Sequence, residues 1–179
     1  MKIAALAASL MVLSSCTPLA LNPFYTPQDL TRDAAFPGVW QEVGGTDRMF
    51  CKESKDGYEC EVIEQDAGSA TFDVHFMRVG EELYADLYPQ NPRIRHGLLK
   101  LHLAPGHTLA RLRRNGDTLR IALLSAEWVR KRPVAHVLVG PKQEDVVLAL
   151  PTKELRLLLV AAGADPKAFT DPEEWRKVR

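Results

Sequence analysis

The chain has 179 residues, 46% of them hydrophobic, and equal numbers of basic and acidic side chains, 23 of each. This length suits one domain with a sizeable core, and the neutral total argues against nucleic-acid binding. Residues 1–90 carry 6 basic and 14 acidic side chains, whereas residues 91–179 carry 17 and 9. We interpret this asymmetry as complementary faces of one domain.

The N-terminus predicts an export signal. Lys2 supplies a positive charge, and the following run Ile3–Leu13 has only one polar residue, Ser9. A membrane-spanning helix needs roughly twenty apolar residues, so this run is too short to be a permanent anchor. A charge, a short apolar run and then small residues follow one another in secretory signals. Residues 1–15 are therefore expected to be removed.

Leu13-Ser14-Ser15-Cys16 closes this run and resembles the lipobox of bacterial lipoproteins. The resemblance implies a diacylglyceryl thioether on Cys16, cleavage before Cys16 and acylation of the new amine. Several acyl chains would hold the chain firmly on a bilayer, at ~0.8 kcal/mol per buried methylene. The non-acidic Thr17 after the cysteine favours, by the same resemblance, the bacterial outer membrane. The alternative is an ordinary signal peptide with a chance cysteine.

The segment after the cysteine predicts a tether, and the rest predicts one domain. Residues 17–31 hold three prolines and no hydrophobic period. We therefore expect residues 16–34 to form a flexible, lipidated tether and residues 35–179 to form the folded domain.

The two remaining cysteines predict a structural disulfide. A four-residue loop at Ser54–Gly57 would place Cys51 directly opposite Cys60 in a hairpin. Opposed residues in a hairpin have β-carbons close enough to bridge, and an exported protein meets an oxidising environment. A catalytic dithiol would instead need CxxC spacing or a helix N-terminus.

Short alternating strands with turn residues between them extend from about residue 36 to residue 124, which is an all-β signal. The segments 69–79 and 82–88 form a hairpin around Gly80-Glu81. One face of it collects apolar side chains, and the other places His75 across from Asp86.

The next hairpin predicts a row of cations. Asn115-Gly116 is a strong two-residue hairpin signal, and as the turn it would pair Arg111 with Arg120 and Leu112 with Leu119. A second turn at Pro105-Gly106 would pair Lys100 with Arg111. Side chains of this row could bind an acidic partner, a lipid headgroup or a fatty-acid carboxylate, because arginine gives paired hydrogen bonds. The candidate ligand-binding residues are Lys100, His102, Arg111, Arg113 and Arg120. The alternative is a solvated outer face.

The hydrophobic period changes after Leu124. Ser125 is expected to cap a short helix that Pro133 stops, and the basic run 130–132 beside Trp128 could contact a membrane surface or could be an exposed helix end. Residues 134–139 and 145–150 are candidate closing strands. Thr152 is expected to cap an amphipathic helix through Ala162, and a last short helix is expected from Asp171.

This pattern predicts a mainly β fold, an antiparallel up-and-down barrel or a sandwich with a C-terminal helix. Gly38-Val39-Trp40 resembles the Gly-x-Trp motif that opens the first strand of lipocalins and related calycin barrels. The resemblance implies that Trp40 closes the barrel floor and that a late arginine, Arg130 or Arg132, packs across it. The Thr-Asp-aromatic turn of lipocalins is missing, which leaves an interior cavity undecided. Alternatively, Trp40 is simply a core aromatic.

Signals of catalysis are poor. The sequence has no nucleophile elbow, HExxH, phosphate-binding loop or dinucleotide fingerprint, and it indicates no cofactor. His96 and His102 lie ~20 Å apart on an extended strand, too far to share a metal ion. His75 with Asp86 is the one candidate acid–base pair, and the alternative is a partly exposed ion pair.

We therefore expect a non-catalytic lipoprotein of the bacterial envelope that binds a small apolar or anionic amphiphile. The alternative is an interaction lipoprotein whose barrel is filled by its own leucines and whose charged faces meet an envelope protein. An enzyme that uses His75 and Asp86 is the third hypothesis.

Overall fold

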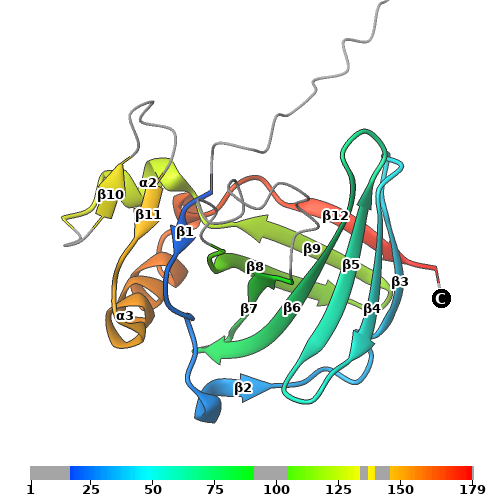
Figure 1. Cartoon of the computed structure of the whole chain (residues 1–179), viewed down its shortest axis with the longest axis horizontal. Helices are drawn as coiled ribbons and strands as arrows, with labels where there is room; N and C mark the ends of the chain where they lie inside the picture. The colour runs from blue at the N-terminus through cyan, green and yellow to red at the C-terminus, as the bar shows by residue number, and fades with distance from the viewer. Residues whose placement is uncertain (1–16, 91–104, 134–136, 140–145, 179) are drawn as a thin grey trace, which may run out of the picture.

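An eight-stranded antiparallel barrel forms the body of the molecule (Figure 1). The computed structural model describes residues 17–90, 105–133, 137–139 and 146–178. Each barrel strand pairs with the next one along the chain, and the β6–β7 and β12–β3 pairings close the circle. The strands are β3 (Gly38–Glu42), β4 (Arg48–Glu53), β5 (Tyr58–Glu64), β6 (Gly68–Val79), β7 (Glu82–Pro89), β8 (Thr108–Asn115), β9 (Thr118–Leu123) and β12 (Glu173–Lys177). The fold is thus mainly β and up-and-down, as the sequence predicts.

Alternation along each strand builds the barrel core. Side chains at every second position point inward, and they form one buried cluster around Trp40, Phe76 and Trp175. An eight-stranded barrel is just wide enough for such side chains to fill it or for one small ligand to bind inside. Which of the two applies depends on the inward-facing residues at each end.

The two ends of the barrel carry different loops. The turns β4–β5, β6–β7 and β8–β9 lie at the end where residues 32–37 enter β3, which we call the sealed end. The turns β3–β4 and β5–β6, the end of β7 and the start of β12 lie at the other, which we call the acidic end. In Figure 1 the β3–β4 and β5–β6 turns stand together at the top of the barrel.

A second layer covers one side of the barrel wall (Figure 1). It contains the helices α2 (Ala126–Arg130) and α3 (Thr152–Gly163), the short 3-10 turn η3 (Pro166–Ala168) and a small sheet of β1 (Leu19–Ala20), β10 (Val137–Val139) and β11 (Val146–Leu148). A second buried cluster lies between this layer and the outward-facing side chains Met77, Tyr84, Leu109 and Ala122 of the barrel. Among the described residues, no helix is long and apolar enough to cross a membrane.

The segment predicted as a tether is part of the folded body. β1 pairs in parallel with β11, and Phe24 is fully buried in the second cluster. After a 3-10 turn, η2 (Pro27–Asp29), β2 (Leu30–Thr31) adds to the edge of β6. Prolines and the missing period suggested a free linker, but isolated apolar residues are enough to dock an irregular segment. Of the proposed tether, only residue 16 lies outside the described residues.

Two hairpins have the predicted register, and one does not. Cys51 lies opposite Cys60, and His75 lies opposite Asp86. In the β8–β9 hairpin, however, Asn115 pairs with Thr118, so that Gly116 takes the first turn position with φ 58°. A positive φ favours glycine at that position. The turn is therefore Gly116-Asp117, one residue later than the predicted Asn115-Gly116 turn.

The C-terminal third differs most from the prediction. The expected helix after Asp171 is the strand β12, and the expected closing strands 134–139 and 145–150 contain β10 and β11 of the small sheet instead. α2 begins as predicted, with the Ser125 hydroxyl accepting the Trp128 amide N–H. The N-cap of α3 is Pro151, because the Thr152 hydroxyl donates to the Pro23 carbonyl.

Candidate functional site

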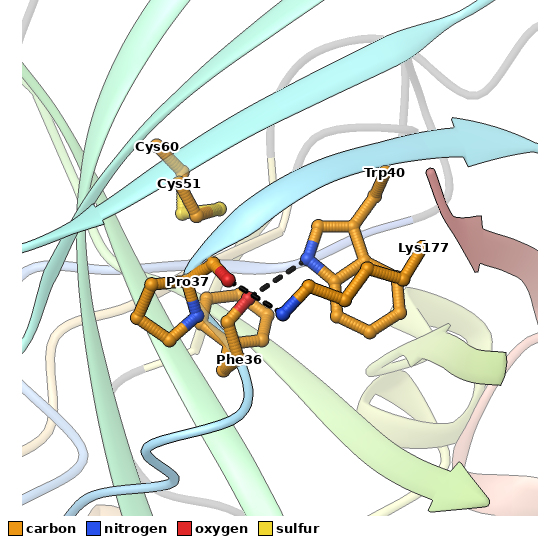
Figure 2. Close-up of a disulfide and its surroundings, with 6 residues drawn as sticks. All are labelled: Phe36, Pro37, Trp40, Cys51, Cys60 and Lys177. Atoms are coloured by element: carbon orange, nitrogen blue, oxygen red, sulfur yellow. Dashed lines mark hydrogen bonds between the residues drawn. A yellow bond between two sulfur atoms is a disulfide. The ribbon is translucent and has the colours of Figure 1, made fainter. Parts of the chain in front are cut away.

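Aromatic rings close the sealed end of the barrel. Phe36 enters from the segment before β3, and its ring centroid lies 4.8 Å from that of Tyr58 and 4.6 Å from that of Phe76. Trp40 is fully buried beside it, and the indole N–H donates to the Phe36 carbonyl over 2.9 Å (Figure 2). This arrangement leaves no buried polar group of Trp40 unsatisfied, and the rings pack on one another as a floor at this end of the barrel.

A lysine, and not the predicted arginine, lies over this floor. The Lys177 ammonium donates to the carbonyls of Ala35 and Pro37 and sits 5.7 Å from the Trp40 ring (Figure 2). Neither Arg130 nor Arg132 lies there, because both belong to the second layer. Trp40 is thus fully buried at this end of the barrel, and β12 supplies the cation that lies over its ring.

The disulfide stands next to the sealed end, as Figure 2 shows. Cys51 and Cys60 are joined and almost fully buried, and Cys51 also pairs with Gly38 at the start of β3. The bridge therefore ties β4 to β5 at a level where β3 enters the barrel. This confirms the predicted pairing.

The acidic end has a different lining. Its inward-facing apolar side chains are mostly only partly buried in the barrel core, whereas those of the sealed end are buried except for Leu83. Three glutamates also occupy inward-facing positions of their strands. Each lies two residues from an inward-facing side chain, because side chains alternate along a strand: Glu173 from Trp175, Glu42 from Trp40 and Glu64 from Val62. The partly buried apolar residues of this end are Val62, Phe72, Leu87, Ile121 and Leu123.

The carboxyl group of Glu173 lies deepest among these glutamates. Burial raises its pKa above the ordinary value, and the negative charge of Glu42 raises it further. The nearby Trp175 indole acts in the opposite direction, although its N–H makes no hydrogen bond of normal geometry in the part of the chain that is described. Among the described residues, the inward-facing positions of this end therefore carry apolar side chains and three glutamates but no lysine or arginine.

Asp86 of the predicted acid–base pair contacts His107 and not His75. Asp86 is fully buried on the outer wall, where one carboxylate oxygen accepts the Phe24 amide N–H and the other lies 2.7 Å from Nδ1 of His107. The His107 backbone in turn pairs with Ala20 of β1. One oxygen of Asp86 therefore holds the N-terminal segment against β7, and the other holds the residue that precedes β8.

His75 stays apart from Asp86 although the two are opposed in the hairpin. Its ring stacks on Tyr25 at 4.7 Å, and its Nδ1 is buried without a hydrogen-bond partner in the described residues. Burial and the charge of Asp86 raise the pKa of the Tyr25 hydroxyl. The structure thus does not bring the His75 imidazole and the Asp86 carboxylate together as an acid–base pair.

The predicted cationic row is not assembled. Arg111 lies opposite Tyr84 and Ala122, and its guanidinium covers the Phe169 ring at 4.4 Å. Arg113 faces Arg120, but each has its own carboxylate, Glu82 at 2.6 Å and Glu174 at 3.1 Å respectively. β8 is flanked by β7 on one side and β9 on the other. Lys100 and His102 lie outside the described residues.

The basic helix end is also neutralised. The Trp128 side chain is 6% exposed, and its indole N–H donates to Asp165, which also accepts from Arg132. Arg132 covers the Trp128 ring, and Lys131 pairs with Glu127. The hydrogen bond from Trp128 is the main reason that the pKa of Asp165 is lowered. Trp128 is therefore an interior residue and does not present its ring to a membrane surface.

Sequence reasoning missed Glu173, Trp175, Lys177 and His107. The first three lie on the strand that was expected to be helical. A signal was present, because Pro is also found at the first residue of strands and tryptophan favours strands. The described residues contain no cluster of three or more side chains suited to hold a metal ion.

Comparison of the chain with protein-family models, curated proteins and solved structures finds no match.

Proposed function

We propose that this chain is a non-catalytic, lipid-anchored protein of the bacterial cell envelope whose barrel binds a small amphiphile at the acidic end. The single observation that carries the proposal is the contrast in burial: at one end the aromatic rings are buried and only Leu83 is partly exposed, while five apolar side chains at the other end are partly exposed. Exposed apolar side chains that converge inside a barrel can bury a ligand's apolar surface, at about 25 cal/mol per Å².

The anionic ligand of the sequence-based hypothesis fits poorly. The described arginines of the row are paired with carboxylates or stacked on a ring, and the partly exposed interior carries glutamates. An apolar or cationic amphiphile is the better fit.

Native mass spectrometry tests the binding. The segment from Thr17 to Arg179, which contains every described element, would be purified from bacterial periplasm and compared with its denatured form. We expect a bound species that is released on denaturation. A bare mass that stays unchanged after incubation with amphiphiles would contradict the proposal and favour the alternative, an interaction protein with an envelope partner.

Two matched substitutions locate the bound species. Val62→Trp would fill the acidic end, whereas Val160→Trp would add the same volume to the exposed side of α3, where Val160 is 57% exposed. We expect the first substitution to abolish the bound species and the second to leave it. Loss of the bound species in both variants, or in neither, would place the ligand elsewhere.

The anchor requires its own test. The full chain would be expressed in a bacterium fed with labelled palmitate, beside a Cys16→Ser variant. We expect the label in the unaltered chain alone, at the mass of a chain that begins at Cys16. Label in neither protein would contradict the lipid anchor and favour an ordinary signal peptide.

A further inference from the structure

The chain is fixed to the folded body almost directly after Cys16. Pro18 is buried, and Ala20 is fully buried between β11 and the residue that precedes β8. The backbones of Ala20 and His107 exchange two hydrogen bonds of 2.8 Å. The residues that lead from Cys16 to Ala20 are therefore part of the fold and do not act as a linker.

This attachment gives the proposed lipid anchor a short reach. The Leu19 side chain packs so closely on Gly106 that a β-carbon there would collide with it, and this contact fixes the position of Leu19. Fully extended, the chain from Cys16 to Leu19 spans only ~11 Å, at ~3.3–3.6 Å per residue. The headgroups of a bilayer cover its hydrocarbon by ~5–8 Å on each side. A lipid on Cys16 would therefore hold Leu19 in the headgroup region or just above it.

β1 docks at the acidic end of the barrel. His107, which pairs with Ala20, directly precedes β8, and β8 starts at this end. From there the N-terminal segment runs along the barrel wall toward the sealed end: Phe24 binds Asp86 of β7, and β2 then pairs with the last part of β6. In Figure 1, β1 starts toward the same side of the molecule as the β3–β4 and β5–β6 turns. A membrane anchor before β1 would thus lie at the acidic end.

The turns at this end determine which bilayer they can approach. Residues 43–47 and 65–67, which connect β3 to β4 and β5 to β6, contain no lysine or arginine, whereas Asp47 and Asp66 supply negative charge. An anionic bilayer would repel these carboxylates, and a bilayer without net charge would not. Val43 in the first turn is 46% exposed and offers apolar surface to the headgroup region.

The exposed side of α3 is the competing face. Leu157 is 64% exposed and Val160 57%, which makes an apolar stripe that could also lie on a bilayer. α3, however, begins beside Pro23, where the Thr152 hydroxyl donates to the Pro23 carbonyl. Pro23 lies beyond Ala20 on the way to the sealed end, so α3 is reached later along the chain from Cys16 than the acidic end is.

We infer that the short connection after Cys16 holds the acidic end of the barrel against a bilayer without net charge, with residues 43–47 and 65–67 facing the headgroups. This inference rests on the lipid anchor of the proposed function and names the surface that faces the membrane. The end that is proposed to bind an amphiphile then faces the membrane from which such a molecule would come.

Probes at the two ends of one strand test the orientation. Ala67→Cys places a thiol in the β5–β6 turn, and Asp56→Cys places one in the β4–β5 turn at the other end of β5; both positions are exposed. Cys16 would carry lipid, and Cys51 and Cys60 are joined, so a maleimide dye reacts with the introduced thiol. The full chain, purified from a bacterial host, would be held in phosphatidylcholine nanodiscs with and without a lipid that carries a nitroxide quencher on its headgroup.

The expected difference follows from the length of β5. The strand separates the two turns by ~20 Å, so we expect the quencher to reduce the fluorescence of the Ala67 probe at least about twofold more than that of the Asp56 probe. A third probe, from Ala161→Cys on the exposed side of α3, should be quenched less than the Ala67 probe. Circular dichroism confirms that each labelled variant is folded.

A spacer tests whether the short connection causes this orientation. About twelve glycine and serine residues inserted between Cys16 and Thr17 would lengthen the connection by ~20 Å on average. We expect quenching at Ala67 to fall to the level at Asp56, while uptake of labelled palmitate stays unchanged.

The outcomes separate the orientation from the anchor. Equal quenching at Ala67 and Asp56, or strongest quenching at Ala161, would overturn the inference, because the barrel would then lie on its side. Absence of quenching at all three positions in a chain that takes up palmitate would also overturn it. Quenching at Ala67 that persists with the spacer would overturn the short connection as the cause. A chain that takes up no palmitate would instead contradict the anchor, and with it the proposed function.

Discussion

The two ends of the barrel are built from the same strands but use their inward-facing residues differently. At the sealed end, rings pack on one another, and the inward-facing Lys177 donates to two carbonyls. At the acidic end, apolar side chains are partly exposed and three glutamates lack ion pairs among the described residues. A binding site is usually less well packed than a core, so under the proposed function stability would come mainly from the sealed end and recognition from the acidic end.

The largest expected effect compares one phenylalanine from each end. Phe36→Ala should cost about 3–5 kcal/mol of unfolding free energy, because Phe36 is 3% exposed and touches three other rings. Phe72→Ala should cost only about 1–2 kcal/mol, since Phe72 is partly exposed. Denaturant unfolding measures both. Equal losses would show that the acidic end is packed as tightly as the sealed end.

Removal of the disulfide should have the next largest effect. The double variant Cys51→Ala, Cys60→Ala frees a loop with a sequence separation of 9, for which loop entropy predicts a loss of about 2–3 kcal/mol. Thermal unfolding of the variant, beside the oxidised chain, measures this loss. If the two proteins melted at the same temperature, the bridge would not contribute to the stability of the sealed end.

The Lys177 contacts can be tested with a neighbouring residue as control. Lys177→Met removes two hydrogen bonds to carbonyls at the sealed end, and we expect it to cost about 1–2 kcal/mol of unfolding free energy. Arg176 is exposed on the other face of β12, so that Arg176→Met should change the free energy by less than ~0.5 kcal/mol. Similar values for both variants would mean that Lys177 does not hold the seal.

Local sequence patterns predict the strands, turns and pairings that depend on residues close to one another in the sequence. Alternation and turn residues predict β3 to β7. The four-residue loop Ser54–Gly57 predicts the disulfide, because pairing within a hairpin is fixed by its turn. The same logic fails by one register step at β8–β9, where Asn115-Gly116 and Gly116-Asp117 are both acceptable turns. In the structure Asn115 pairs with Thr118, so Gly116-Asp117 is the turn, with φ 58° at Gly116.

The acidic end could not be predicted, because it depends on a pairing across the whole chain. Asp171-Pro172 followed by two glutamates starts a helix as readily as a strand when judged locally. The gap between β3 and β9 decides the outcome: β12 pairs with both and closes the barrel. Glu173 and Trp175 are brought to the interior by that tertiary pairing alone. The Asp86–His107 pair is likewise set by the docking of β1.

The smallest expected effect concerns the charge of Glu173 and depends on pH. Its pKa is raised in the folded chain by burial and by Glu42, so the folded state holds the proton more tightly than the unfolded state. The contribution of Glu173 to stability is then greatest below the ordinary pKa of glutamate and falls as the pH rises through the raised pKa. Glu173→Gln cannot ionise, so at pH 7 it should melt up to a few degrees above the unaltered chain, and this gain should vanish near pH 4.

Thermal melts at the two pH values, with Glu174→Gln as control, measure this difference. The control loses only an exposed ion pair with Arg120, so it should melt slightly below the unaltered chain at pH 7. If Glu173→Gln were instead less stable at pH 7 than at pH 4, relative to the unaltered chain, the Glu173 carboxylate would have a stabilising partner. The acidic end would then be neutralised like the outer wall, and the difference between the two ends would reduce to packing.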